Sequence, residues 1–289
     1  MFNRVGLFAK KDDPQVTQTL LKLVQLLQER GLEILLDETS QTLIGESVPA
    51  MSGSPHAEGR DLVIVVGGDG TMLSAARALF EFDVPLLGIN LGRLGFLADL
   101  NPADVPDGID AILDGKFVEE LRTFLRCRAY RGGDLVAESN AFNDAVIQKC
   151  NTARLIGLNT YINGHFLHSQ RSDGQIIATP TGSTAYALSG GGPILHPSLD
   201  ALVIVPICPH TLSQRPIAIA GNNRIEIDVN TRESDRAELT CDGETICTLQ
   251  PGDRVQIVKH DGRIRLLHPA GHDHYVTLRA KLGWGSDPC

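Results

Sequence analysis

Hydrophobic residues in the first third of the chain follow two alternating patterns. Short aliphatic runs, which predict buried strands, lie at residues 4–9, 33–36, 62–66 and 85–89. Between the first two runs, apolar residues recur at helical spacing, with Asp13-Pro14 at the start of this helix and Gly31 at its end. A second helix is expected from Met72 to about Phe80. Alternating strands and helices predict a small α/β domain built on a parallel sheet.

Two further stretches belong to this region. The run from Thr39 to Gly59 is polar and rich in Ser, Gly and Pro, so it predicts a surface loop. A short helix around residues 109–113 is expected to connect the first domain to the next part of the chain.

From Val118 onward the hydrophobic period shortens to that of half-buried strands, with arginines at the alternate positions. Further strands are expected at residues 135–142, 155–162, 165–169, 175–178, 202–205, 224–229, 238–241, 245–249, 254–259 and 263–267. Turns are expected at Gly132-Gly133, Asn163-Gly164, Asp242-Gly243, Pro251-Gly252 and Asp261-Gly262. Closely spaced short strands predict a second, all-β domain of the sandwich type.

The last apolar pattern, from Asp273 to Leu282, predicts one amphipathic helix that returns to the first domain. Its apolar face would consist of Tyr275, Val276, Leu278 and Leu282. The expected domains are therefore residues 1–100 with 272–289, and residues 101–271.

Composition limits the function more than it limits the fold. The 289 residues are 42% hydrophobic and 21% charged, which is typical of a globular protein. A formal net charge of -9 argues against broad binding to nucleic acid or to an anionic membrane. The apolar stretch Val5 to Ala9 is too short for a signal sequence or a membrane span, so a cytoplasmic location is expected.

The cysteines and histidines do not indicate a metal centre. The six cysteines include no Cys-x-x-Cys pair, so neither a zinc site nor a disulfide framework is predicted. His165 and His168, and the pair His272 and His274, lack a His-Glu-x-x-His pattern. No metal held by protein ligands is expected.

The strand at residues 62–66 ends abruptly in glycines, which predicts a turn at the ligand-binding edge of the sheet. Gly67, Gly68 and Gly70 leave the backbone bare for phosphate oxygens, and Thr71 is expected to cap the following helix. Asp69 is the one long side chain in the turn. The competing interpretation is a tight turn in which Asp69 is a solvated cap. The P-loop lysine and the Gly-x-Gly-x-x-Gly fingerprint are both missing.

Two more polar clusters are candidates for ligand binding. Asn143-Asp144 follows a predicted strand and offers an amide and a carboxylate to sugar hydroxyls, although the dipeptide alone favours a β-bulge or an Asx turn. Asp173-Gly174 precedes a loop from Thr179 to Pro193 that is rich in hydroxyls and glycines. This loop, with a short helix starting near Ser183 or Thr184, suits a nucleotide, and the alternative is a flexible surface loop.

These clusters together resemble the bacterial NAD kinase family. The resemblance rests on five blocks in the family's order: Gly67-Gly68-Asp69-Gly70-Thr71, Asn90-x-Gly92-x-Leu94-Gly95-Phe96-Leu97, Phe142-Asn143-Asp144, Asp173-Gly174 and Thr181 to Pro193. It implies a Rossmann-like N-terminal domain of the type that NAD kinases share with phosphofructokinases, followed by a C-terminal β-sandwich. It also implies transfer of the γ-phosphoryl group of ATP, carried with Mg²⁺, to the 2'-hydroxyl of the adenosine ribose of NAD.

The resemblance also implies roles for single residues. Asp69 matches the catalytic carboxylate, and Gly67, Gly68, Gly70 and Thr71 match the phosphate-binding turn. The NAD-binding residues would be Asp69, Gly70, Asn143, Asp144, Asp173, Thr184, Ala185, Tyr186 and Ser189, joined by Arg154 and Arg171, which could come from a neighbouring subunit. Family members are commonly homodimers or homotetramers, and the same is expected here.

Two other functions stay open at this point. A diacylglycerol-type lipid kinase shares the Gly-Gly-Asp-Gly turn, and a non-catalytic NAD- or NADP-binding regulator could use the same fold. The sequence does not decide between ATP, other nucleotides and polyphosphate as phosphoryl donor, between NAD and NADH as acceptor, or whether NADPH inhibits.

Overall fold

In the computed structural model the chain forms two compact units, Met1–Leu121 with Ile264–Cys289, and Arg122–Arg263. The structure describes residues 2–9, 14–45, 51–52, 60–92, 95–150, 154–230 and 236–285. Both unit boundaries fall inside long strands, β6 (Phe117–Arg131) and β17 (Arg254–Pro269). These boundaries differ from those of the expected domains, which were residues 1–100 with 272–289, and residues 101–271.

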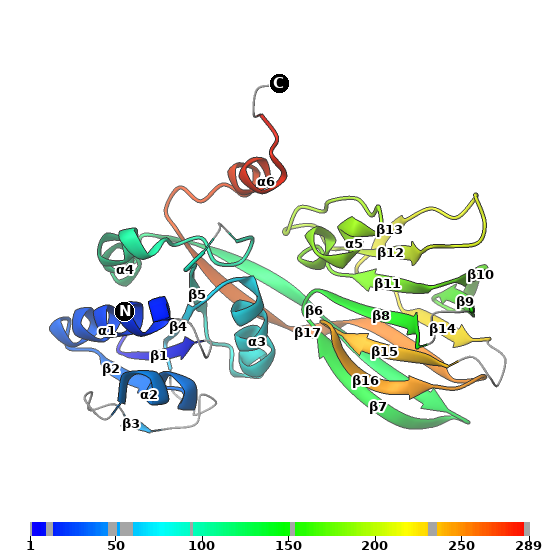
Figure 1. The fold of residues 1–289 in the computed structure, drawn as a ribbon, viewed down its shortest axis with the longest axis horizontal. Helices are drawn as coiled ribbons and strands as arrows, with labels where there is room; N and C mark the ends of the chain where they lie inside the picture. The colour runs from blue at the N-terminus through cyan, green and yellow to red at the C-terminus, as the bar shows by residue number, and fades with distance from the viewer. Residues whose placement is uncertain are drawn as a thin grey trace. The chain divides into compact units, whose positions relative to one another are not determined.

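The first unit is built on a parallel sheet in the order β5-β4-β1-β2-β3 (Figure 1). Its strands are β1 (Arg4–Ala9), β2 (Glu33–Leu36), β3 (Met51–Ser52), β4 (Leu62–Val66) and β5 (Leu86–Ile89), and the end of β17 pairs parallel to β5. All five residues of β4 are buried, as a strand covered on both faces requires. The predicted strands of this domain are confirmed.

In the described part of the first unit, five α-helices and two 3-10 turns accompany this sheet. They are α1 (Pro14–Glu29), α2 (Glu38–Ile44), α3 (Asp69–Leu79), α4 (Val105–Leu113) and α6 (His274–Leu282), with the 3-10 turn η3 (Pro102–Asp104) ahead of α4. Another 3-10 turn, η2 (Phe80–Phe82), extends α3. Helix α1 has the predicted apolar face, while Asp13 lies outside the described residues.

The predicted loop from Thr39 to Gly59 is wrong where the structure describes it. Helix α2 begins there because the Asp37 carboxylate accepts a hydrogen bond from the Ser40 amide (2.9 Å), and β3 follows as an edge strand. Polar composition hid this N-cap, since the same residue types favour caps and loops. Residues 46–50 and 53–59 of the predicted loop lie outside the described part.

Helix α6 forms where predicted and belongs to the first unit, but its buried face is different. His274, Thr277 and Leu278 are buried, while Tyr275 and Val276 are about half exposed. The register follows from Asp273, whose carboxylate accepts from the Tyr275 amide (2.8 Å) and fixes where the helix begins. The predicted apolar face is therefore wrong for Tyr275 and Val276 and confirmed for Leu278. Among the described residues, none of the helices combines the length and apolar character that crossing a membrane requires.

The second unit contains two antiparallel sheets. One has the order β13-β12-β11-β8-β15-β16, and in the other β10, β9, β14 and the first half of β17 are neighbours, with β6 pairing with β7. The remaining strands are β7 (Asp134–Ala141), β8 (Asp144–Lys149), β9 (Ile156–Ile162), β10 (His165–Ser172), β11 (Gly174–Ala178), β12 (Ala201–Ile207), β13 (Ile217–Ala220), β14 (Ile225–Val229), β15 (Ala237–Cys241) and β16 (Glu244–Leu249).

Inward-facing residues of both sheets share one hydrophobic core, with Ile147 and Ile177 from one sheet and Leu158 and Ile257 from the other. This confirms the predicted sandwich. Strand β13 was not predicted, because Ile217–Ala220 is short and mostly exposed. The predicted turn at Asp261-Gly262 is wrong: the chain stays extended there, and the Gly262 amide donates to His260 Nδ1 (2.8 Å).

Candidate functional site

The turn after β4 starts a helix three residues earlier than predicted, at Asp69 instead of Met72, with Gly68 as N-cap. Thr71 is therefore not the cap. Its amide donates to the Gly68 carbonyl (2.9 Å), and its buried side chain packs on Gly67, where a Cβ atom would overlap Thr71 Oγ1. Because the Gly67 amide donates to the Ile89 carbonyl (2.9 Å), only the amides of Gly68, Asp69 and Gly70 are placed to meet a phosphate at the helix start.

Asp69 is fixed in position by a segment that follows β5. Its Oδ2 accepts from the Phe96 amide (2.9 Å), and its Oδ1 accepts from the Leu97 amide (3.0 Å). Gly95 makes this approach possible, since a Cβ there would overlap Asp69 Oδ1. The solvated-cap interpretation is therefore wrong, because this half-buried carboxylate is a positioned group with one lone pair left on each oxygen.

The segment from Asn90 to Leu97, one of the five blocks of the resemblance, reaches Asp69 through the amides of Phe96 and Leu97. Asn90 is buried, and its Oδ1 accepts from the Gly92 amide (3.1 Å), which shapes the turn out of β5. Leu94 lies outside the described residues. A Cβ atom added to Gly68, Gly70 or Gly92 would meet no atom within 4 Å, so the backbone is accessible at this edge of the sheet.

In the second unit, Asn143 and Asp144 line a cavity of about 250 Å³. Val146, Gln148, Ala185, Tyr186, Thr240, Asp242 and Gly243 complete its lining. Asp242, which sequence reasoning identified only as part of a turn, is central here. Its carboxylate accepts from the amides of Phe142 (2.8 Å), Asn143 (2.7 Å) and Asp144 (3.1 Å). The Asn143-Asp144 bend is thus held by a carboxylate from a hairpin far along the chain.

Asp144 has an unusual protonation equilibrium. Burial, followed by the negative charge of Asp242, raises the pKa of Asp144 from 3.8 to about 7. A carboxyl group that is partly protonated near neutral pH can donate a hydrogen bond as well as accept one. Such a group suits a ligand that presents hydroxyls.

The polar loop after β11 is packed rather than flexible. Thr179 Oγ1 donates to the Phe142 carbonyl (2.7 Å), and Ser183 Oγ donates to the Pro180 carbonyl (2.6 Å) while accepting from the Leu195 amide (2.9 Å). Thr179, Thr181 and Ser183 are buried. The hydroxyls of Thr179 and Ser183 therefore bond backbone groups of the protein instead of facing a ligand, and the flexible-loop alternative is wrong as well.

The loop brings two of its four predicted contact residues to the cavity. The 3-10 turn η4 (Gly182–Thr184) and the short helix α5 (Tyr186–Ser189) place Ala185 and the half-exposed Tyr186 in the lining. Thr184 instead donates from Oγ1 to the Thr181 carbonyl (3.1 Å), and Ser189 is exposed at the end of α5. Neither of these two lines the cavity.

Asp173, Arg154 and Arg171 are not brought to this cavity within the second unit. Asp173 forms an ion pair with Lys149 (2.5 Å), at the opposite end of β8 from Asp144. Strand register gives a separation of five residues, or roughly 16 Å. Arg171, on β10, and Arg154, ahead of β9, are both exposed.

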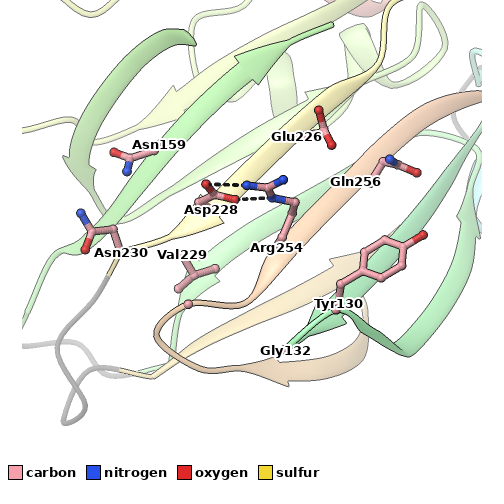
Figure 2. A pocket seen from close by; sticks show the side chains of 11 residues that line it. Tyr130, Gly132, Asn159, Glu226, Asp228, Val229, Asn230, Arg254 and Gln256 are labelled. Atoms are coloured by element: carbon pink, nitrogen blue, oxygen red, sulfur yellow. Dashed lines mark hydrogen bonds and ion pairs between the residues drawn. The ribbon is translucent and has the colours of Figure 1, made fainter. Parts of the chain in front are cut away.

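A larger cavity of about 720 Å³ lies elsewhere in this unit, and Figure 2 shows its lining. Arg254 forms a two-point ion pair with Asp228 (2.6 and 3.0 Å) on its surface, with Tyr130 and Glu226 nearby. None of its lining residues belongs to the predicted site, so volume alone does not mark the functional cavity in this unit.

Comparison with known proteins agrees with the resemblance. The sequence profile of the ATP-NAD kinase N-terminal domain matches residues 5–117, and that of the ATP-NAD kinase C-terminal domain matches residues 142–268. An NAD kinase from Chromohalobacter salexigens is 45% identical over 286 residues, covering 99% of this chain and 98% of that protein. An NAD kinase from Hahella chejuensis is 46% identical, covering 99% and 97%.

Two solved structures have the same fold. Yeast NADH kinase complexed with NADH aligns with a TM-score of 0.89 at 23% identity, covering 100% of this chain and 89% of that one. An NAD kinase from Archaeoglobus fulgidus in complex with ATP aligns with a TM-score of 0.73 at 23% identity, covering 96% and 99%. At this identity the likeness concerns the fold alone.

Proposed function

Because the chain belongs to the NAD kinase family, we propose that it transfers the γ-phosphoryl group of ATP to the 2'-hydroxyl of the adenosine ribose of NAD, giving NADP. The structural observation that carries this proposal is the position of Asp69. A carboxylate fixed by two amides stands at the bare start of α3, so a proton acceptor and a phosphate-binding helix end are adjacent.

Asp69 is proposed as the catalytic base. A ribose hydroxyl is a weak nucleophile, and it needs an acceptor for its proton as the bond to phosphorus forms. The amides of Phe96 and Leu97 hold the Asp69 carboxylate in one orientation, which leaves the remaining lone pairs for the hydroxyl. The exposed amides of Gly68 and Gly70 are proposed to bind phosphate oxygens at the helix end, where anions are favoured.

The cavity of the second unit is proposed to bind the hydroxyl-rich part of NAD. Asn143 and Asp144 would hydrogen-bond ribose hydroxyls, and the half-exposed ring of Tyr186 offers a flat surface to a base or to the nicotinamide. Asp242 would act indirectly, because it orients the Asn143-Asp144 backbone.

Mg²⁺ is proposed to arrive on the phosphates of ATP. Magnesium prefers oxygen ligands and usually keeps several waters, with one or two carboxylates from the protein. Asp69 is the carboxylate at the start of α3. With one of its oxygens accepting the ribose proton, the other keeps one lone pair beyond its bond to a loop amide and would fit that limited role. The metal would neutralise charge on the transferred phosphoryl group.

The same proposal includes a cytoplasmic location and a homo-oligomeric state. The scattered spacing of the cysteines fits a reducing compartment. Of the two alternatives, lipid phosphorylation is disfavoured because the cavity beside Asp144 is lined by amide, carboxyl and hydroxyl groups. A non-catalytic regulator is disfavoured by the intact, positioned Asp69.

The test is a coupled assay for NADP with NAD, ATP and Mg²⁺, repeated with NADH and polyphosphate. Asp69→Asn should lower kcat by about 10²- to 10⁴-fold, the range expected for a general base. The new amide group would also place a donor against a backbone N-H, so thermal stability and NAD binding are measured beside kcat. Asp107→Asn, at an exposed position on α4, is the matched control and should be fully active. Full activity of Asp69→Asn would overturn the role of Asp69, and no NADP from any donor would overturn the function.

A further inference from the structure

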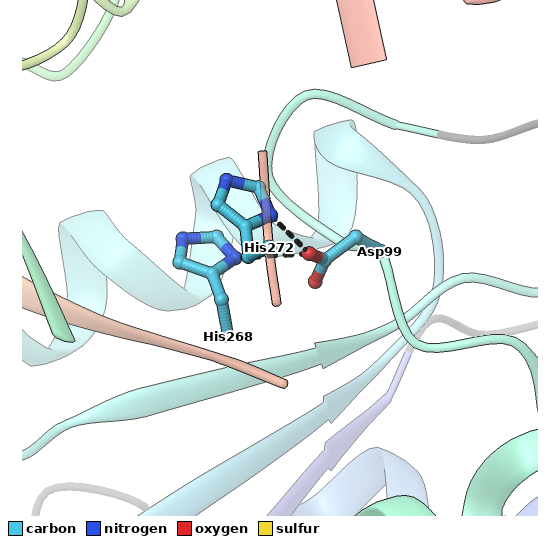
Figure 3. Close-up of side chains that lie close together, drawn as sticks. All are labelled: Asp99, His268 and His272. Atoms are coloured by element: carbon cyan, nitrogen blue, oxygen red, sulfur yellow. Dashed lines mark hydrogen bonds and ion pairs between the residues drawn. The ribbon is translucent and has the colours of Figure 1, made fainter. Parts of the chain in front are cut away.

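Asp99, His268 and His272 form a compact cluster in the first unit that the proposed reaction does not use (Figure 3). Asp99 follows the segment that holds Asp69, His268 lies near the end of β17, and His272 lies in the turn before α6. The His268 side chain is 1% exposed, that of His272 8% and that of Asp99 13%. Three side chains with metal-binding atoms thus meet almost out of contact with water.

The Nδ1 atoms of both histidines face the same oxygen of Asp99. One oxygen, Asp99 Oδ2, lies 3.2 Å from His268 Nδ1 and 2.6 Å from His272 Nδ1. The two imidazole rings are stacked, with centroids 4.0 Å apart and planes inclined by 18°. Figure 3 shows both rings turned to the same carboxylate. One potential ligand atom from each of the three residues lies within 4.8 Å of the others.

These distances suit a small ion with nitrogen and oxygen ligands. Ligand atoms at about 2.1 Å in a tetrahedral zinc site are about 3.4 Å apart. The Asp99 to His268 separation is close to that value, and the Asp99 to His272 pair needs to open by under about 1 Å. Two imidazole nitrogens and one carboxylate favour a zinc-like transition metal over magnesium, which prefers oxygen.

Glu120 completes the surroundings on the far side of both rings. Its carboxylate lies 3.5 Å from His268 Nε2 and 3.8 Å from His272 Nε2. Histidines that bind a metal through one nitrogen usually direct the other N-H to a carboxylate or carbonyl, which fixes the tautomer. With Glu120, the cluster also carries two carboxylates, whose charge matches that of a divalent cation.

We propose that Asp99, His268 and His272 bind a divalent transition metal of the zinc type, with Glu120 as the partner of both imidazoles. This contradicts the sequence-based expectation of no protein-held metal. The sequence shows no metal-binding motif here for two reasons. Asp99 is about 170 residues from the two histidines, and the histidines, at i and i+4, lie in a strand and the following turn rather than on a helix.

The metal would join the C-terminal segment to the segment that positions Asp69. Asp99 lies two residues after Leu97, whose amide binds Asp69, and the Phe96 ring lies 6.4 Å from the His274 ring of α6. A metal at this point has a structural role, because it fastens α6 and the Phe96–Leu97 segment to the same site. The proposal does not depend on which phosphoryl acceptor the protein uses.

The first experiment measures metal binding to the full chain. Metal-free protein is titrated with Co²⁺, and bound cobalt is followed by its visible d–d absorption and then displaced with Zn²⁺. One equivalent should bind, with a rise in Tm on addition of Zn²⁺. His272→Gln and Asp99→Asn should each weaken Co²⁺ binding by more than about 100-fold, since they remove a ligand atom. His165→Gln, at an exposed position on β10, is the control and should bind as the wild type does.

A second measurement does not depend on whether the variants fold. Crystals of the wild-type protein grown with Zn²⁺ should show an anomalous peak at the zinc edge between Asp99, His268 and His272. Absence of that peak, or Co²⁺ binding that is equal in wild type and His272→Gln, would overturn the proposal. NADP formation is assayed separately, so a failed metal site leaves the proposed reaction untouched.

Discussion

Asp144 shows how burial changes the chemistry of a single residue. Its carboxyl group lies beside the Asp242 carboxylate, away from water, and its pKa is raised to about 7. The native state therefore binds this proton more tightly than the unfolded chain does. It follows that Asp144 costs nothing well below pH 4, where it is protonated in both states. It destabilises the fold increasingly as the pH rises from about 4 to about 7, and the cost is constant above that, where it is ionised in both states.

This gives a prediction for Asp144→Asn, which removes the charge while keeping the shape of the side chain. The variant should gain stability relative to the wild type between pH 5 and pH 8, by at most on the order of 4 kcal/mol. Urea unfolding at both pH values measures the difference, and Asp107→Asn serves as the surface control. A difference that is the same at pH 5 and pH 8 would contradict the raised pKa.

At this scale the sequence predicted candidate site residues better than it predicted their hydrogen-bond partners. Asp69 stood out because it is the one long side chain in a glycine turn, and Asn143 and Asp144 because an amide and a carboxylate directly follow a predicted strand. Asp242 did not, because Asp-Gly is a common turn and its three amide partners lie about 100 residues earlier in the chain. Contacts over such separations arise from the fold and leave no local pattern.

The segment after β5 is an element whose shape depends on one glycine. Gly95 lets the chain pass close enough for the Phe96 and Leu97 amides to reach Asp69, and a Cβ would overlap Asp69 Oδ1 and come within 3.0 Å of the Ala98 carbonyl. Gly92, three residues earlier, has open space at the same position. The two glycines therefore form a matched pair.

Gly95→Ala should displace Asp69 and lower kcat by about 10²-fold, the loss expected when a catalytic group is misplaced by about 1 Å. Gly92→Ala should keep wild-type kcat, because its new methyl group meets no atom within 4 Å. Steady-state kinetics of both variants, with Tm as a check on folding, measures this. Equal loss in the two variants would mean that the position of Asp69 is not set by Gly95.

Hydrophobic periodicity predicted the interior strands and α1 well. It failed where the same residue types favour two different local structures, such as a helix cap and a loop. The Thr39 to Ile44 stretch looked like a loop because the residues that cap a helix also favour turns. In α6 the choice of buried face was decided by the Asp273 cap and by contact with Phe96, which an isolated helical pattern does not contain.

For the whole molecule, the two-domain organisation followed from the change of hydrophobic period near Val118. The order of strands did not, since it depends on pairings such as β17 with both β14 and β5. Continuous strands through both boundaries also carry no turn signal. The class of each domain could therefore be predicted from the sequence. The connection between the domains could not, because it depends on pairing between strands that are far apart in the chain.

Two of the predicted NAD-binding residues of the second unit, Asp144 and Asp173, lie too far apart to bind the same ribose within one copy of the chain. Asp144 and Tyr186 line one cavity, whereas Asp173 lies near the other end of β8, roughly 16 Å away by strand register. Two side chains so far apart do not bind the same ribose. If Asp173 contacts the ligand held at Asp144, we expect it to come from a second copy in a symmetric oligomer.

Mixing two inactive variants tests this arrangement. Asp173→Ala and Tyr186→Ala should each lose activity alone, but a mixed dimer would contain one site with both native residues. Random 1:1 mixing should then recover about a quarter of wild-type activity, because half of the dimers are mixed and half of their sites are intact. Asp144→Ala mixed with Tyr186→Ala is the control, since both residues line one cavity of a single copy and no recovery is expected. Recovery in the first mixture alone would assign Asp173 to the partner copy, and recovery in neither would contradict a shared site.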